Sequence, residues 1–163
     1  LGYPGGPIIE KKALLGNPLA FRFPRAFLEK NSLDFSFSGL KTSVRNVILK
    51  RNFGKSPVLS DSDISAGFQD AVIDVLTYKA ILACKKEKIN RIVVTGGVAA
   101  NNALRNSISK TANSHGFKTF FPKMEFCTDN AAMIACAGYY KSLKSNPFNK
   151  DALFLDASAS LSL

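Results

Sequence analysis

The sequence predicts an α/β fold that is rich in helices, with a small hairpin and a partial parallel sheet. Two short apolar runs, residues 92–94 and 117–121, each precede a helical pattern. This strand–helix–strand–helix order is typical of parallel strands joined by crossover helices. The 163 residues are 46% hydrophobic and 21% charged, which is enough for one domain with a hydrophobic core.

The first 60 residues are expected to form a helix, a hairpin and a second helix. Gly5-Gly6 stands just before Pro7, and proline suits the first position of a helix. Phenylalanines alternate with other residues over 19–27 and 33–37, which favours two paired strands. The second helix runs from Ser38 to about Arg51, with a stripe of apolar residues at helical spacing: Leu40, Val44, Val47 and Ile48.

A long helix follows, from about Asp63 to Lys86, with Ser60 or Ser62 as its N-cap. Its two apolar stripes indicate that it is covered on two sides and therefore central. The next helix is expected from about Asn101 to Ser114, ended by His115-Gly116.

Two glycine turns at helix starts are candidate ligand sites. Gly96-Gly97 lies between a strand and the helix that begins near Asn101, and Gly6 lies at the start of the first helix. Glycine permits close approach of the backbone, and a helix N-terminus offers unpaired N–H donors to a phosphate or another oxyanion. Many such turns bind nothing, so the residues alone leave both interpretations open.

Two carboxylates near helix starts have two interpretations each. Glu10 favours the dipole of the first helix, or contacts a ligand hydroxyl. Asp129 is a natural N-cap for the last helix, or lines the same crevice as Gly96-Gly97, because both follow a strand.

The net charge of +10 is unevenly distributed. Residues 1–60 hold ten Lys and Arg against three acids, whereas residues 61–163 hold twelve against nine. This asymmetry indicates a polyanionic partner on one side, and the segment 19–55 is where an RNA backbone would dock. A solvated cationic surface is the simpler alternative.

The cysteines and the termini indicate a cytoplasmic protein that does not enter a membrane. Cys84, Cys127 and Cys136 form no C-x-x-C motif, which favours three reduced thiols. Cys127 stands beside a helix start, yet a buried structural thiol is the favoured interpretation over a reactive one. We expect no signal peptide, because the first residues, LGYPGG, lack a basic region and a long apolar segment, and no apolar run is long enough to span a bilayer.

Three motifs occur together in this chain: GYPGGP at 2–7, DFSFSGLKT at 34–42 with GGVAANNALR at 96–105, and EFCTDNAAMIA at 125–135. Together they resemble the TsaD family, the tRNA threonylcarbamoyladenosine transferases once described as sialoglycoproteases. The resemblance implies the actin/Hsp70-like (ASKHA) fold, in which two ribonuclease-H-like lobes surround a ligand cleft. It also implies transfer of the threonylcarbamoyl group from threonylcarbamoyl-adenylate to N6 of the adenosine next to the anticodon, in tRNAs that read codons beginning with A.

The resemblance also implies roles for individual residues, although it assigns no catalytic residue. Gly6 and Asn101 match ligand-binding positions, and Glu10 matches a position that touches the ribose in members with an acid there. Asp129 matches a ligand of a divalent metal, usually described as iron or zinc, of which each full-length subunit holds one. The implied partners are tRNA, the paralogue TsaB and the ATPase TsaE.

The chain departs from the family pattern in its metal motif and its length. It has one His and lacks the H-x-E-x-H motif that supplies the other metal ligands, and it matches only the C-terminal part of the family protein. We therefore expect residues 1–163 to be a single C-terminal lobe fragment, inactive in isolation. Residues 1–60 would form a basic helix–hairpin–helix insertion, and residues 61–163 an α/β part.

Two other functions fit parts of the sequence. The glycine turns would also suit an ATP-binding kinase or ATPase of the same superfold, whereas no motif supports a protease. The charge asymmetry alone would suit a non-catalytic RNA-binding fragment.

Overall fold

The computed structural model describes residues 1–27, 31–53 and 59–144. The chain forms two compact units, one of residues 1–127 and one that begins at Thr128. In chain order, the elements of the first unit are α1 (Gly5–Ala13), α2 (Ser38–Asn52), α3 (Asp61–Glu87), β1 (Arg91–Val93), η1 (Gly97–Ala100), α4 (Asn102–Ser114), β2 (Lys118–Phe120) and η2 (Met124–Phe126). These elements confirm a helix-rich α/β fold.

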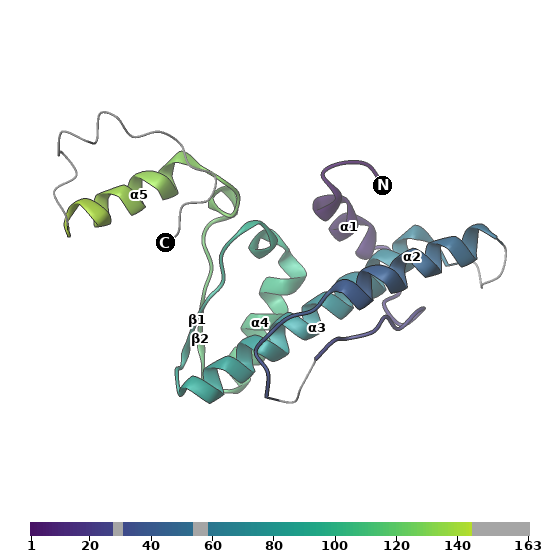
Figure 1. Ribbon diagram of the computed structural model, residues 1–163, viewed down its shortest axis with the longest axis horizontal. Helices are drawn as coiled ribbons and strands as arrows, with labels where there is room; N and C mark the ends of the chain where they lie inside the picture. The colour runs from purple at the N-terminus through teal and green to yellow at the C-terminus, as the bar shows by residue number, and fades with distance from the viewer. Residues whose placement is uncertain (28–30, 54–58, 145–163) are drawn as a thin grey trace. The chain divides into compact units, whose positions relative to one another are not determined.

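Helix α3 is the central element of the first unit, as its two apolar stripes predict. Helices α1, α2 and α4 all pack against it (Figure 1). Ser60 is its N-cap: the Ser60 hydroxyl accepts from the Asp63 N–H, and the Asp63 carboxylate accepts from the Ser60 N–H. The helix ends at Glu87, and its C-cap, Lys88, adopts a left-handed conformation at φ 55°.

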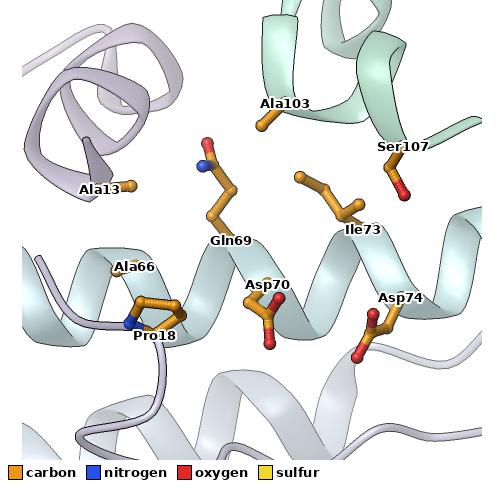
Figure 2. A pocket seen from close by; sticks show the side chains of 9 residues that line it. All are labelled: Ala13, Pro18, Ala66, Gln69, Asp70, Ile73, Asp74, Ala103 and Ser107. Atoms are coloured by element: carbon orange, nitrogen blue, oxygen red, sulfur yellow. The ribbon is translucent and has the colours of Figure 1, made fainter. Parts of the chain in front are cut away.

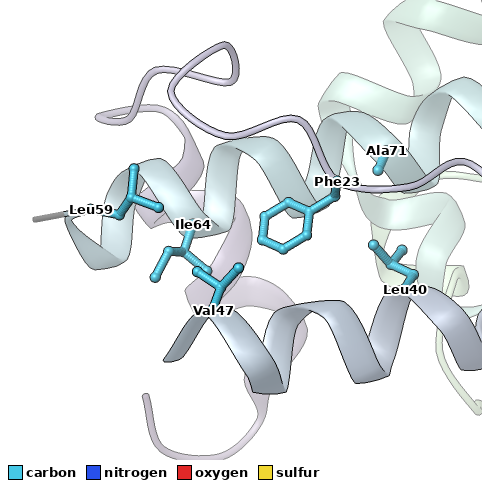
Figure 3. Packing of buried hydrophobic residues seen from close by; sticks show 6 residues of the cluster. All are labelled: Phe23, Leu40, Val47, Leu59, Ile64 and Ala71. Atoms are coloured by element: carbon cyan, nitrogen blue, oxygen red, sulfur yellow. The ribbon is translucent and has the colours of Figure 1, made fainter. Parts of the chain in front are cut away.

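A cluster of buried apolar side chains joins α2 to one side of α3 (Figure 3). Phe23 is its largest member and is only 1% exposed. Leu40 and Val47 reach it from α2, and Ile64 and Ala71 reach it from α3. The cluster therefore fixes α2 and the segment around Phe23 on the long helix.

The predicted hairpin is wrong for the residues that the structure describes. Residues 19–27 and 31–37 contain no strand, and the expected connection includes residues 28–30, which lie outside the described part. The segment packs on α3 instead. Phe21 and Phe23 lie against Gly67, where a Cβ atom would be 2.7 Å from the Phe21 carbonyl oxygen. The alternating phenylalanines therefore belong to a segment that packs on a helix and pairs with no strand.

An arginine anchors the same segment to α3. The Arg25 Nε donates to the Asp74 carboxylate at 2.9 Å, and the other end of its guanidinium pairs with Asp70. Its Nη1 also donates to the Phe23 carbonyl at 2.8 Å. Because Pro24 has no N–H and Arg25 binds a helix, the segment gains side-chain contacts in place of strand pairing.

The predicted parallel sheet is confirmed. β1 and β2 pair in parallel, with Ile92 opposite Thr119 and Val93 opposite Phe120. A second apolar cluster covers the sheet and is built from α3, β1 and α4: Ile81, Cys84, Ile92 and Ala112. The carboxyl end of β1 leads directly into Gly96-Gly97 and η1.

The second unit carries α5 (Ala131–Ser142), and its N-cap is Asn130 rather than Asp129. The Asn130 Oδ1 accepts from the Met133 N–H at 2.9 Å, three residues along the chain. The expectation for Asp129 as the cap was wrong because its neighbour holds that position. The tail 145–163 lies outside the described residues, and within the described ones no helix is long and apolar enough to cross a bilayer.

Candidate functional site

A pocket of about 200 Å³ lies where α1, α3, η1 and the start of α4 meet. Its walls are largely apolar, and two of the expected ligand residues line it: Gly6 from α1 and Asn101 from the N-cap of α4. The other lining residues are Ile9, Phe68, Gln69, Val72, Ile73, Leu76, Val98 and Leu104. An apolar pocket with a few polar groups at one edge is the usual form of a small-molecule site, and this volume suits one ring rather than a whole ligand.

Asn101 is held in a single orientation by two hydrogen bonds. Its Oδ1 accepts from the Leu104 N–H at 2.8 Å, which makes it the N-cap of α4. Its Nδ2 donates to the Gln69 Oε1 on α3, also at 2.8 Å. Asn101 is thus a helix cap and at the same time a fixed polar group at the pocket edge.

Glu10 follows the pocket residue Ile9 in α1, and its carboxylate accepts hydrogen bonds from the first residue of α4. Its Oε1 accepts from the Asn102 N–H at 2.8 Å and from the Asn102 Nδ2 at 3.2 Å. A carboxylate at this position is favourable, because the first turn of a helix has free N–H groups and a positive dipole end. Glu10 therefore stabilises the start of α4. The interpretation that it favours the dipole of α1 is wrong, because α1 begins at Gly5 and its first turn contains no acidic residue.

Gly96 is the N-cap of η1 and Gly97 is its first residue, and together they form an open turn after β1. Gly96 has φ +92°, a backbone conformation that other residues rarely adopt, and its carbonyl accepts from the Ala99 N–H. Both glycines are exposed, and a Cβ atom on either would meet no atom within 4 Å. The turn therefore leaves free space next to the backbone, which suits the approach of an anion.

Asp129, the expected metal ligand, is exposed and belongs to the second unit. Among the residues that the structure describes, no group of three or more His, Cys, Asp and Glu side chains is arranged to hold a metal ion. The described residues thus offer one carboxylate and do not by themselves form the metal site that the family resemblance implies.

A second crevice, of about 270 Å³, shares Gln69 and Ile73 with the pocket. Figure 2 shows both side chains projecting from α3 between α1, which carries Ala13, and α4, which carries Ser107. Its two carboxylates, Asp70 and Asp74, already pair with Arg25. Ala103 of the motif GGVAANNALR lines this crevice, whereas the candidate ligand residues are not among its lining residues.

Arg105 on α4 fixes the glycine turn to the end of the sheet. Its Nε donates to the Ala99 carbonyl at 2.5 Å, and its Nη2 donates to the Pro122 carbonyl at 2.7 Å. The same Nη2 lies 3.1 Å from the Cys127 Sγ, and the guanidinium lies over the Phe121 ring. Cys127 is 3% exposed, which confirms the interpretation as a buried structural thiol.

The sequence did not predict a role in the site for Gln69, Asn102 or the side chain of Arg105. Gln69 carried the clearest signal, because it precedes Ile73 and Leu76 at helical spacing and thus places an amide in an apolar stripe. Its partner is 32 residues away along the chain, so the contact itself was not visible from local spacing.

The fold and the pocket define an α/β protein with a candidate ligand pocket at the start of a helix. A family model described as "TsaD: tRNA N6-adenosine threonylcarbamoyltransferase" matches residues 1–136. Proteins named tRNA N6-adenosine threonylcarbamoyltransferase are 46% identical in Desulfitobacterium hafniense, over 94% of this chain, and 50% identical in Moorella thermoacetica, over 88%. In Clostridioides difficile the identity is 49%, over 86% of this chain.

The chain belongs to the TsaD family. It spans less than half the length of these relatives: 45% of the Desulfitobacterium protein, 41% of the Clostridioides protein and 42% of the Moorella protein.

Proposed function

We propose that this chain is the ligand-binding part of a cytoplasmic transferase that modifies tRNA. The whole protein would move the threonylcarbamoyl group from threonylcarbamoyl-adenylate to N6 of the adenosine next to the anticodon, in tRNAs that read A-starting codons. The observation that carries the proposal is the pocket in which Gly6 and Asn101, separated by most of the chain, lie together. Family membership supports the reaction.

The chemistry of the pocket suits an adenylate. Apolar side chains such as Phe68 and Val98 offer a surface for a flat ring, and the amide of Asn101 offers a polar contact at its edge. The open turn at Gly96-Gly97 leaves room for the phosphate beside backbone N–H groups. The second carboxylate oxygen of Glu10 would accept a hydrogen bond from a ribose hydroxyl.

The metal is part of the proposal for the whole protein. Asp129 would supply one oxygen ligand to a divalent ion, iron or zinc, and residues outside this chain would supply the others. Such an ion acts as a Lewis acid on a carbonyl oxygen when it is bound. The fold proposed for the whole protein is the two-lobe ASKHA architecture, and its proposed helpers are TsaB and TsaE.

The basic first part of the chain is the proposed tRNA surface. Lys41, Arg45 and Lys50 are exposed on α2, whereas Arg25 and Arg51 are occupied by ion pairs with α3. These three are therefore α2 cations that are available to phosphates, and Arg22 in the preceding segment is exposed as well. Lys41→Ala should reduce the salt dependence of tRNA binding by about one phosphate contact. Arg51→Ala, the matched control, should leave that slope unchanged, and equal slopes for both variants would reject this surface.

The reaction is tested by measuring the modified nucleoside in tRNA from cells whose single copy of the protein carries a substitution. Asn101→Ser is suitable because serine also caps helices but lacks the amide. We expect it to lower threonylcarbamoyladenosine at least tenfold by mass spectrometry, and Asp129→Ala to abolish it. Asn106→Ser, at an exposed position of the same helix, is the control and should have no effect. Normal levels in Asn101→Ser and in Asp129→Ala would reject the proposal.

A further inference from the structure

Gln69 is the one polar side chain besides Asn101 that lines the pocket within the described residues, and no motif includes it. It stands on α3, in its first half, with Phe68 and Val72 beside it in the pocket wall. Its amide oxygen accepts a hydrogen bond from the Asn101 amide, and this contact indicates why a polar side chain lies among apolar ones.

The orientation of both amides follows from a backbone donor. The Leu104 N–H can only donate, so the atom of Asn101 that faces it at 2.8 Å must be the oxygen. The Asn101 nitrogen must then face Gln69, and Gln69 must present its oxygen to it. One backbone group therefore determines the direction of a chain of two side-chain hydrogen bonds.

This direction decides what the pocket offers to a ligand. One hydrogen of the Asn101 Nδ2 is used by Gln69, and the other remains for a ligand acceptor. Without the Gln69 oxygen, the amide group of Asn101 would keep its cap bond but lose the contact that holds its nitrogen at the pocket edge. Preorganised donors bind better because less conformational entropy is lost when the ligand arrives.

We propose that Gln69 is a positioning residue for adenylate binding: its Oε1 holds the Asn101 amide so that the second Nδ2 hydrogen points to an acceptor atom of the nucleoside. The inference rests on the proposed function, because it takes the ligand of this pocket to be an adenosine derivative.

The test uses the intact protein and neutral adenosine as the probe in calorimetry, so that an added charge at position 69 does not repel a phosphate. Gln69→Leu removes the acceptor at similar size and should weaken adenosine binding about tenfold, as expected for the loss of roughly one hydrogen bond. Gln69→Glu retains an acceptor for Asn101 and should bind within about threefold of the unaltered protein. Gln69→Met, an unbranched apolar residue of similar length, should repeat the leucine result if the leucine variant does not fold.

A double-mutant cycle separates a positioning role from a structural one. In the Asn101→Ser background, which has no amide to position, Gln69→Leu should change adenosine affinity less than twofold. In the transfer reaction, Gln69→Leu should raise the KM for threonylcarbamoyl-adenylate and leave kcat within about twofold, because it acts on binding.

If Gln69→Leu leaves the adenosine affinity within twofold of that of the unaltered protein, the inference is overturned while the proposed function stands. An equal loss in Gln69→Glu and Gln69→Leu, or an undiminished effect of Gln69→Leu in the Asn101→Ser background, also overturns it. An unaltered protein that binds neither adenosine nor AMP contradicts the proposed function itself.

Discussion

Two regions on the central helix α3 differ in how they hold their neighbours. On one side, the cluster around Phe23 joins α2 to α3 through apolar contacts. At the pocket, directed hydrogen bonds join the start of α4 to its neighbours: the Asn102 N–H donates to Glu10 of α1, and the Asn101 amide donates to Gln69 of α3. Apolar contacts are strong but non-directional, whereas hydrogen bonds add little net stability and determine orientation. Changes in the first region should therefore cost stability, and changes in the second should cost affinity.

The largest expected effect is Phe23→Ala. Phe23 is 1% exposed, and removing a buried phenyl ring costs about 3–5 kcal/mol in lost transfer free energy and cavity formation. The free energy of unfolding, measured with urea, should fall by this amount. Phe35→Ala is the matched control, because Phe35 is 50% exposed and should cost less than about 1 kcal/mol. Equal losses of unfolding free energy at the two positions would contradict the role of Phe23 as a buried core residue.

Gly16→Ala should have the next largest effect, and it should lower both the stability of the protein and its affinity for adenosine. A Cβ atom at Gly16 would lie 2.0 Å from the Ser62 carbonyl oxygen, so the turn that follows α1 would have to move away from α3. We expect a loss of about 1–3 kcal/mol and weaker adenosine binding, since Gly6 and Ile9 of α1 line the pocket.

The control for Gly16→Ala is Gly39→Ala. Gly39 lies in α2, where a Cβ atom meets nothing within 4 Å, and alanine favours a helix. Its unfolding free energy should be unchanged or higher. A Gly16→Ala protein as stable as the Gly39→Ala protein would contradict the close approach of α1 and α3.

Glu10→Ala should affect affinity more than stability. It removes the acceptor of two Asn102 hydrogen bonds at the start of α4, and water can replace part of that contact. Adenosine binding should weaken a few-fold, with a loss of stability below about 1 kcal/mol. Glu10→Gln keeps a carbonyl acceptor and should bind within about twofold of the unaltered protein. If the glutamine variant binds as weakly as the alanine variant, the contact with Asn102 is not what Glu10 contributes.

The smallest expected effect is the change with pH of the stability that Asp63 provides at the start of α3. Hydrogen bonds from the Asn17 N–H and from Ser60 lower the pKa of Asp63 below its ordinary value of about 3.9. Because the folded-state pKa is the lower one, the stabilisation by the carboxylate is fully present above about pH 4 and is lost as the pH falls through the folded-state value.

The pH dependence of the melting temperature checks this. The difference between the unaltered protein and Asp63→Ala should be constant from pH 5 to 7 and shrink below about pH 4. Ser60→Ala, which removes the N-cap, should cost about 1 kcal/mol at neutral pH. A difference that grows on acidification would contradict the sign of the pKa shift.

The fold was predictable from the sequence where the signals are local. The N-cap at Ser60, the cap at Asn101 and the periodic apolar residues between them determine two helices, and both helices lie close to their expected bounds. The hairpin was not predictable, because alternating phenylalanines fit both a paired strand and an extended segment on a helix. Only the contacts of Phe23 and Arg25 with α3 distinguish these structures.

The candidate site was predictable in part for the same reason. Gly6 and Asn101 stand in motifs at helix starts, and the structure brings them into one pocket. Gln69 and Arg105 form hydrogen bonds with residues of other elements, and local sequence patterns do not predict such contacts. The ligand roles of Gly6, Glu10, Gly96, Gly97, Asn101 and Asp129 stay predictions.

A crystal structure of the intact protein with AMP bound would show whether this pocket holds the nucleoside. We expect the adenine to lie in the pocket between Gly6 and Asn101, with an acceptor atom of the nucleoside within hydrogen-bonding distance of the Asn101 Nδ2. The Asn101–Gln69 hydrogen bond should be retained. The phosphate should lie near Gly96 and Gly97. An adenine bound elsewhere, with this pocket left empty, would contradict this expectation.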